Sequence, residues 1–294
     1  MNSDNLGIID INKCIYPGEN IRFWIAILAT IPAILLYFFI TYLTMGVALI
    51  IIPIIIFFSW FITRLLRASL LGSCIEVSPD NFPQIYKLLE DIRKYLDYPK
   101  KIEAYVYQNG DVNAFLIKKF RTRMILLPHE LLVDMSEGEG QIELIWILAR
   151  SIGHLKAKHL SLWGINDVID AFEKLFVLNI FLYPYERATQ YSGDRIGLAI
   201  CSNLNASLTA MNKLMVGNVL SKKVSLIGEL KQNKELKGSF FAWVAECLST
   251  HPHTTKRIFS LIKWSKDYNT KLYTKFIDNH PEIKHLESEL LLIT

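Results

Sequence analysis

The most prominent pattern in the chain is a long apolar stretch near its N-terminal end. No position from Phe23 to Thr63 carries a charged side chain. A helix needs about 20 mostly apolar residues to cross the hydrocarbon core of a membrane, so the stretch is about twice the length of one span. The sequence Thr44-Met45-Gly46 permits a turn in its middle. The pattern therefore predicts a transmembrane helical hairpin, with helices over about 23–42 and 47–62.

The charges that flank this stretch predict its orientation. Lys13 and Arg22 precede it, Arg64 and Arg67 follow it, and the connecting turn carries no charge. By the positive-inside rule, both ends then lie in the cytoplasm. We expect an integral protein of the plasma or inner membrane, with the lipid bilayer as one partner and with the segment 1–22 and the globular domain on the cytoplasmic side. The alternative, a helical pair buried in a soluble core, would need polar residues on one face, and the stretch offers few.

The remainder of the chain, residues 68–294, has the pattern of a globular domain. Apolar residues at helical spacing over 84–96 predict a helix. Three short β-branched or aromatic runs, over 102–107, 114–118 and 124–127, predict a small antiparallel sheet. The later helices are predicted over 141–162, 165–181, 185–202, 206–216 and 255–268, and the polar, Lys-rich segment 222–238 is expected to be mainly a loop. The predicted class is α+β, mostly helical.

The overall composition excludes several kinds of protein. With 51% hydrophobic residues and a mean hydropathy of +0.26, the chain is not disordered. The net charge of +4 is not gathered in one block, so no nucleic acid is expected as a partner. Four cysteines lie far apart without a Cys-x-x-Cys pair, which excludes a disulfide framework and a zinc ribbon.

The helix predicted over 141–162 carries the candidate chemistry. Zinc peptidases of the His-Glu-x-x-His type place two imidazoles four residues apart on one helix face, and a Glu beside the first activates the metal-bound water. In this chain His154 holds the position of the second imidazole. The first position is Arg150, and the Glu position is Ser151.

Several short motifs, in this order along the chain, give it a family resemblance. The motifs are Ala68-Ser69-Leu70-Leu71-Gly72, Val112-Asn113-Ala114-Phe115, Gly153-His154 with His159, Asp194-Arg195, and Ser249-Thr250-His251-Pro252 with Arg257-Ile258. Over residues 68 to about 262 the chain resembles the M48 family of membrane-associated zinc metallopeptidases. The resemblance implies a gluzincin-type metallopeptidase-like domain behind the membrane hairpin. It also implies a third ligand Glu four residues before an Asp, positions that are Gln190 and Asp194 here.

The departures from the family pattern predict loss of the metal. A guanidinium such as that of Arg150 stays protonated and has no lone pair for zinc. Gln190 offers only a neutral carbonyl oxygen, and Ser151 is no general base near neutral pH. Only His154 remains of a ligand set that needs three protein side chains. We therefore expect no zinc cofactor and no catalytic residues at the family positions Arg150, Ser151, His154, Gln190 and Asp194.

Other candidate sites are weaker. His129-Glu130 is followed by Val133 at the place of a second His, so it is expected to mark a strand-to-helix junction. Ser151 precedes His154 by three residues, but no Gly-x-Ser-x-Gly elbow surrounds it. None of these forms a convincing active site.

The remaining histidines have structural interpretations. His251 and His253 are expected in the first turn of a helix that Thr250 caps. His159 stands about 140° from His154 around an ideal helix, so the two should not share a face, and we expect His159 at the surface.

Three functions remain open at this point. The first is a catalytically inactive homologue that binds a protein or peptide, with Asn113, Ala114 and Phe115 on the rim strand that pairs with the peptide. The second is a divergent active zinc metallopeptidase, and the third is a structural membrane anchor or scaffold.

The substitutions also predict a new contact. Arg150 is expected to reach Gln190 and Asp194 across the two helices, with His154 also near Asp194, so that the helices are joined without metal. The alternative is that Arg150 extends to solvent.

Overall fold

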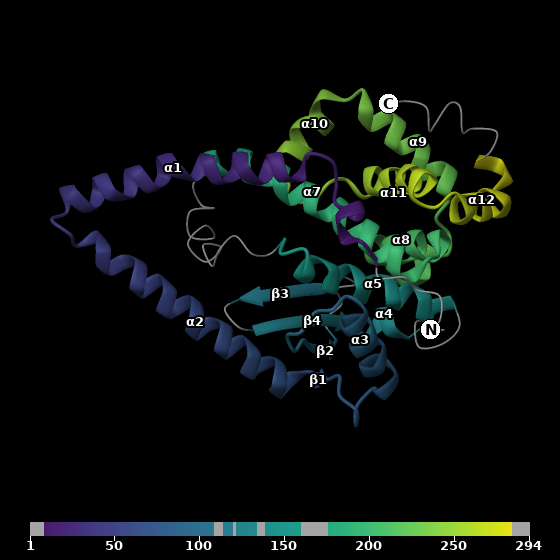
Figure 1. Cartoon of the computed structure of the whole chain (residues 1–294), viewed down its shortest axis with the longest axis horizontal. Helices are drawn as coiled ribbons and strands as arrows, with labels where there is room; N and C mark the ends of the chain where they lie inside the picture. Colours follow the sequence, from purple (N-terminus) through teal and green to yellow (C-terminus); the bar gives the residue numbers. More distant parts are fainter. Residues whose placement is uncertain (1–8, 109–113, 120–121, 134–138, 160–175, 284–294) are drawn as a thin grey trace.

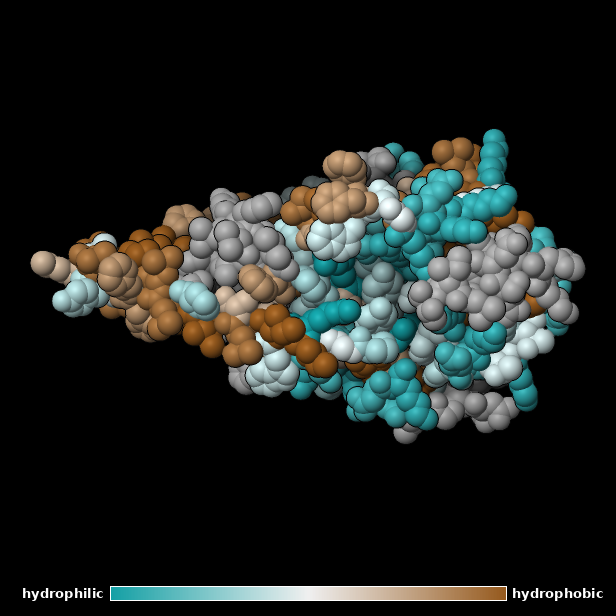
Figure 2. Space-filling model, turned by 90° about the horizontal axis from the view of Figure 1, so that it is seen from above, coloured by the Kyte–Doolittle hydropathy of each residue, from teal (hydrophilic) through white to brown (hydrophobic). Residues whose placement is uncertain are grey.

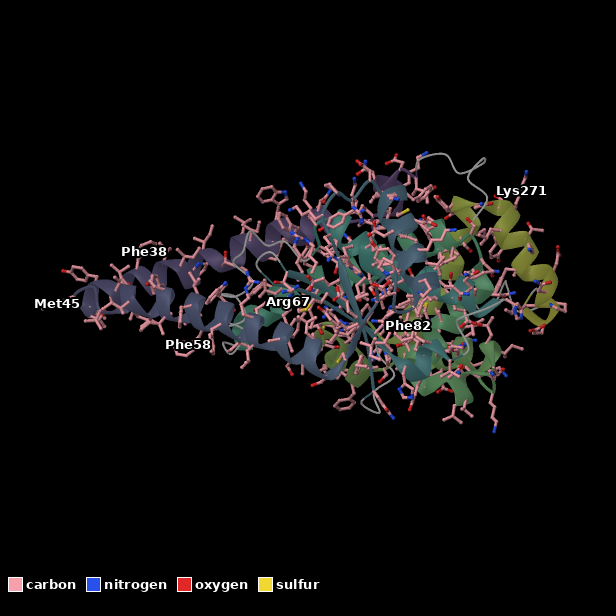
Figure 3. The ribbon with its side chains drawn as sticks, turned by 90° about the horizontal axis from the view of Figure 1, so that it is seen from below. Phe38, Met45, Phe58, Arg67, Phe82 and Lys271 are labelled. Carbon is pink, nitrogen blue, oxygen red and sulfur yellow. The ribbon has the colours of Figure 1, made fainter. Side chains whose placement is uncertain are left out.

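The computed structural model describes residues 9–108, 114–119, 122–133, 139–159 and 176–283, and all structural statements concern these ranges. Two long helices diverge from a tip near Met45, which Figure 3 labels, and the globular domain lies at their open end (Figure 1). The domain is mostly helical and contains one small sheet, in agreement with the predicted class.

The two long helices are α1 (Glu19–Leu43) and α2 (Ala48–Ser73). They are joined where Met45 and Gly46 adopt positive φ angles, so the turn lies where the sequence predicted it. Both helices are long and apolar enough to cross a membrane, and only 6% of each apolar window is buried. Figure 3 shows the side chains of Phe38 and Phe58 projecting away from the pair. This exposure argues against a helical pair buried in a soluble core.

Both helices are attached to the domain at their bases. Ala26 of α1 packs against Leu182 and Tyr185. Helix α2 continues through the expected boundary at residue 68, and its Leu70 packs against Tyr105 of the sheet. The hairpin and the domain are therefore connected by continuous helices rather than by linkers.

The sheet contains β1 (Ile75–Glu76), β2 (Glu103–Tyr107), β3 (Phe115–Lys119) and β4 (Thr122–Pro128), in the order β1-β2-β4-β3. Strand β3 pairs with β4 in antiparallel fashion, but β2 pairs with β4 in parallel. The prediction of an antiparallel sheet is therefore wrong, because the sheet is mixed. The apolar strand β4 lies inside the sheet. Strand β3, which ends in two lysines, lies at an edge, where charged residues are best accommodated.

The helices of the domain follow the sequence pattern in part. They are α3 (Pro83–Tyr95), α4 (His129–Leu132), α5 (Glu139–Lys156), α7 (Phe176–Cys201), α8 (Leu204–Ser221), α9 (Leu226–Lys237), α10 (Phe240–Cys247), α11 (Thr254–Tyr268) and α12 (Thr270–Asn279). Helix α7 runs through Pro184 without the predicted break. The segment expected to be a loop forms α9, which Ser225 caps by accepting a hydrogen bond from Gly228 N. Most of the helix predicted over 165–181 lies outside the described residues.

Helices α5 and α7 pack closely because glycines line their contact. A Cβ atom on Gly193 would lie 2.2 Å from Nε2 of His154, and one on Gly153 would lie 2.6 Å from a methyl carbon of Ile196. Real Cβ atoms do not approach so closely, so larger residues would force the helices apart. The close approach brings the polar side chains of both helices into one cluster.

Candidate functional site: a cluster centred on Asp194

Asp194 of α7 is the centre of a buried ionic cluster. Its side chain is 2% exposed. Arg150 of α5 donates from Nε to Oδ1 at 2.8 Å. Arg257 of α11 donates from Nε to Oδ2 at 2.8 Å and from Nη2 to Oδ1 at 2.7 Å. This one carboxylate therefore links α5, α7 and α11.

Arg150 makes a second contact across the same interface. Its Nη2 donates to Oε1 of Gln190, one turn before Asp194 on α7. The predicted contact of Arg150 with Gln190 and Asp194 is therefore confirmed. With Arg257 added, these four residues are called the Asp194 cluster below.

The electrostatics of the cluster leave it with a net positive charge. Burial alone would raise the pKa of Asp194, but Arg257 and Arg150 outweigh it and hold the pKa below its usual value. The pKa of His154 lies well below its usual value, first because of burial and then because of Arg150 and His159. An ionised Asp194 and a neutral His154 thus face two guanidinium groups.

The side chain of His154 contacts that of His159. The two Nδ1 atoms lie 3.0 Å apart, and one of them must donate to the other. His159 is buried, so the expectation that it lies at the surface is wrong. Helix α5 ends at Lys156, and Lys158, with φ of +62°, turns the chain back toward the helix, so the ideal helical angle no longer applies.

A polar chain continues from His159 to the base of the hairpin. Nε2 of His159 lies 3.0 Å from Oε1 of Glu19, in the first turn of α1. Ser192 of α7 donates to the other oxygen of Glu19 and accepts from Tyr16 N at 2.8 Å. The start of the first apolar helix is therefore attached directly to the α5–α7 pair.

Sequence reasoning missed three residues of this arrangement. Arg257 was part of a family motif but received no role. Glu19 and Ser192 were not singled out. The available signal for Glu19 was weak: it is the last carboxylate before the charge-free stretch.

The weaker candidates do not form a site. Ser151 donates to the Ile147 carbonyl at 2.9 Å, within its own helix. His129 begins α4 directly after β4, which confirms the predicted strand-to-helix junction.

The predicted cap by Thr250 is wrong, because α11 begins at Thr254 after His253. Thr250 Oγ1 instead lies 2.7 Å from Nδ1 of His251. The pKa of His251 is lowered, first by burial and then by Arg257 and Arg150.

The predicted peptide rim lies on an edge strand. Strand β3 is last in the strand order, and Phe115 pairs with Leu126 of β4 on its inner side. Ala114 directly precedes β3, whereas Asn113 lies outside the described residues.

Comparison with known protein families gives one match. The model of peptidase family M48 matches residues 164–265. Over these residues the chain is similar to that family. The match contains Gln190, Asp194 and Arg257 and begins after α5, so Arg150 and His154 lie outside it. No curated protein and no solved structure matches the chain.

M48 peptidases usually depend on zinc, and the residues at the family positions of this chain do not fit the ion. His154 is the one strong donor at the family positions. The oxygen of Gln190 already accepts from Arg150, whose cation would repel a metal. In the part of the chain that the structure describes, no three His, Cys, Asp or Glu side chains are grouped to hold a metal.

Proposed function

We propose that this chain is a membrane-anchored, catalytically inactive M48 homologue that acts by binding a protein or peptide. The observation that carries the proposal is the position of Arg150. Its guanidinium contacts both Gln190 and Asp194, the positions that hold a ligand Glu and its following Asp in the family pattern. In this proposal a cation that belongs to the chain takes the place of the metal that the family pattern calls for.

The loss of hydrolysis follows from the chemistry of the side chains. Peptide hydrolysis by a zinc peptidase needs three ligands and a general base. The hydroxyl of Ser151 cannot replace a carboxylate as base, and it donates to its own helix. Restoring function would require changes at Arg150, Ser151 and Gln190 together.

Peptide binding is supported by the edge position of β3 in the sheet. An edge strand carries backbone N–H and C=O groups that an extended peptide can pair with. In this proposal a partner segment adds a strand beside β3, near Ala114 and Phe115, and is held without being cut.

The proposal includes the orientation predicted from the basic flanks. The hairpin crosses the membrane twice, and the domain lies on the cytoplasmic side. A periplasm-active reporter fused to Thr294 should then remain inactive. A strong periplasmic signal would contradict this orientation.

Metal content tests the central claim. The purified full chain should hold well under one zinc per chain, measured by elemental mass spectrometry. The triple variant Arg150→His, Ser151→Glu and Gln190→Glu should gain zinc, and Arg150→Ala, the matched control, should not. Stoichiometric zinc in the natural chain, with casein cleavage that a chelator stops, would establish the divergent active peptidase instead.

Photo-crosslinking separates peptide binding from a purely structural anchor. A photoreactive residue at Ala114 should give a protein adduct, whereas the same residue at Lys271, on the distant α12, should not (Figure 3). Equal labelling at both positions would favour the structural anchor.

A further inference from the structure

Helix α10 presents three aromatic side chains outward. Phe240 is 67% exposed, Phe241 81% and Trp243 59%, and no residue of this helix is buried. The rings form one group, since the centroid of Phe240 lies 5.7 Å from that of Phe241 and 5.9 Å from that of Trp243. An exposed group of aromatic side chains of this kind is typical of a contact surface rather than of a surface that faces water.

The rest of the molecule holds α10 in a fixed position. Arg187 of α7 donates from Nη1 to the carbonyl of Glu246 at 2.7 Å and to that of Ser249 at 2.8 Å. Glu246 also pairs with Lys256 of α11. The aromatic group is therefore carried by an anchored helix.

This position coincides with the start of the charge-free stretch. Two residues before Arg187, the ring of Tyr185 lies 5.4 Å from that of Phe23, the first residue of the stretch. One turn of α7 thus contacts both α10 and the part of α1 in which the charge-free stretch begins. Figure 1 shows α10 beside the domain end of α1.

We propose that α10 lies in the interfacial layer of the membrane that the hairpin crosses, with its aromatic rings at the boundary between head groups and acyl chains. Aromatic side chains favour this layer, and a helix that lies flat there buries one apolar face. Seen from above, apolar atoms over α10 lie close to the base of the apolar hairpin (Figure 2). The lipid-facing surface of the hairpin thus continues onto the domain.

The charges near α10 agree with a lipid occupant. The segment before α10 carries five exposed lysines: Lys222, Lys223, Lys231, Lys234 and Lys237. Of the acidic residues there and in α10, Glu229 is buried and Glu246 is paired, which leaves Glu235 exposed. A basic segment beside an aromatic helix suits the anionic head groups of a cytoplasmic leaflet.

Photo-crosslinking of the full chain in membranes of phosphatidylethanolamine and phosphatidylglycerol tests the proposal. Benzoylphenylalanine replaces Phe241 in one variant and Phe82 in the control. Phe82 is a 38% exposed phenylalanine of the domain that Figure 3 shows away from the hairpin. We expect roughly tenfold more phospholipid adduct at 241 than at 82, because an interfacial side chain stays within reach of acyl chains.

A second measurement avoids the artificial residue. The emission of Trp243 is the difference in tryptophan fluorescence between the natural chain and the Trp243→Phe variant. Lipids brominated near the head group should quench this emission. Equal lipid labelling at 241 and 82, or no quenching of this emission, would overturn the proposal. A protein adduct at 241 without a lipid adduct would also overturn it and assign the face to a protein partner. The outcome does not depend on zinc content, so it is separate from the test of the inactive site.

Discussion

The Asp194 cluster and the outer surface of the hairpin differ in where they place charged and apolar side chains. The cluster contains charged side chains that are largely buried: Arg150 and Arg257 each form an ion pair with Asp194. In the hairpin, side chains such as Leu35 and Phe38 are apolar, and 63% and 60% of their surface is exposed.

The same physical rule explains both regions. A charge is stable inside a protein only when partners replace the water that it loses. Exposing an apolar side chain to water costs free energy, whereas exposing it to lipid does not. The cluster therefore has the character of a protein interior, and the hairpin is long and apolar enough to cross a bilayer.

The largest expected effect comes from breaking the cluster. Asp194→Asn leaves the guanidiniums of Arg150 and Arg257 buried without a carboxylate, and it should cost about 3–5 kcal/mol of the free energy of unfolding. Thermal unfolding of the purified full chain measures this loss. Arg150→Ala should add little to a chain that already carries Asp194→Asn, because the two residues act as one unit. Losses under about 0.5 kcal/mol for each single change would show that the pairing does not stabilise the fold.

Placing a charge on the hairpin tests the other region. Leu35→Lys puts an ammonium in the middle of α1, and insertion of that helix should become less favourable by about 2.5–3.5 kcal/mol. Extraction of the protein by alkaline carbonate reports the change. The matched control is Leu65→Lys, at a similarly exposed leucine outside the charge-free stretch. If both variants stay equally membrane-bound, the surface of the hairpin does not face lipid.

The close approach of α5 and α7 predicts a smaller effect. Gly193→Ala places a methyl group against the ring of His154, and overpacking of this kind costs about 1–3 kcal/mol. Gly228→Ala in α9 is the control, since its Cβ would meet Ser225 at an ordinary 3.7 Å. The melting temperature of the Gly193→Ala variant should therefore lie below that of the Gly228→Ala variant. Equal values would mean that the helices can move apart without cost.

Acidification should give the smallest effect. Because the pKa of His154 is lowered in the folded state, unfolding takes up a proton below about pH 6.5, and stability falls from that pH downward. One histidine contributes about 1 kcal/mol at pH 5.5 by this linkage. His154→Gln should remove that part of the slope, while His251, whose pKa is also lowered, keeps its own part. An unchanged slope in the variant would contradict the lowered pKa of His154.

The sequence by itself determined the features that depend on local composition and spacing. The missing charges from Phe23 to Thr63 are enough to specify two apolar helices, because crossing hydrocarbon requires only length and apolarity. The residue types at Arg150 and Gln190, which cannot serve as strong zinc ligands, could also be read directly, because a side chain's donor chemistry does not depend on the fold. Their mutual contact was predictable once both were placed on neighbouring helices.

The tertiary structure alone decided which distant residues complete the cluster. Arg257 reaches Asp194 from 63 positions further along the chain, and Glu19 reaches Ser192 from 173 positions before it. No periodicity links residues so far apart, since their proximity depends on how whole helices pack. The parallel pairing of β2 with β4 has the same origin. The burial of His159 also depended on a single backbone turn at Lys158, which helical spacing could not reveal.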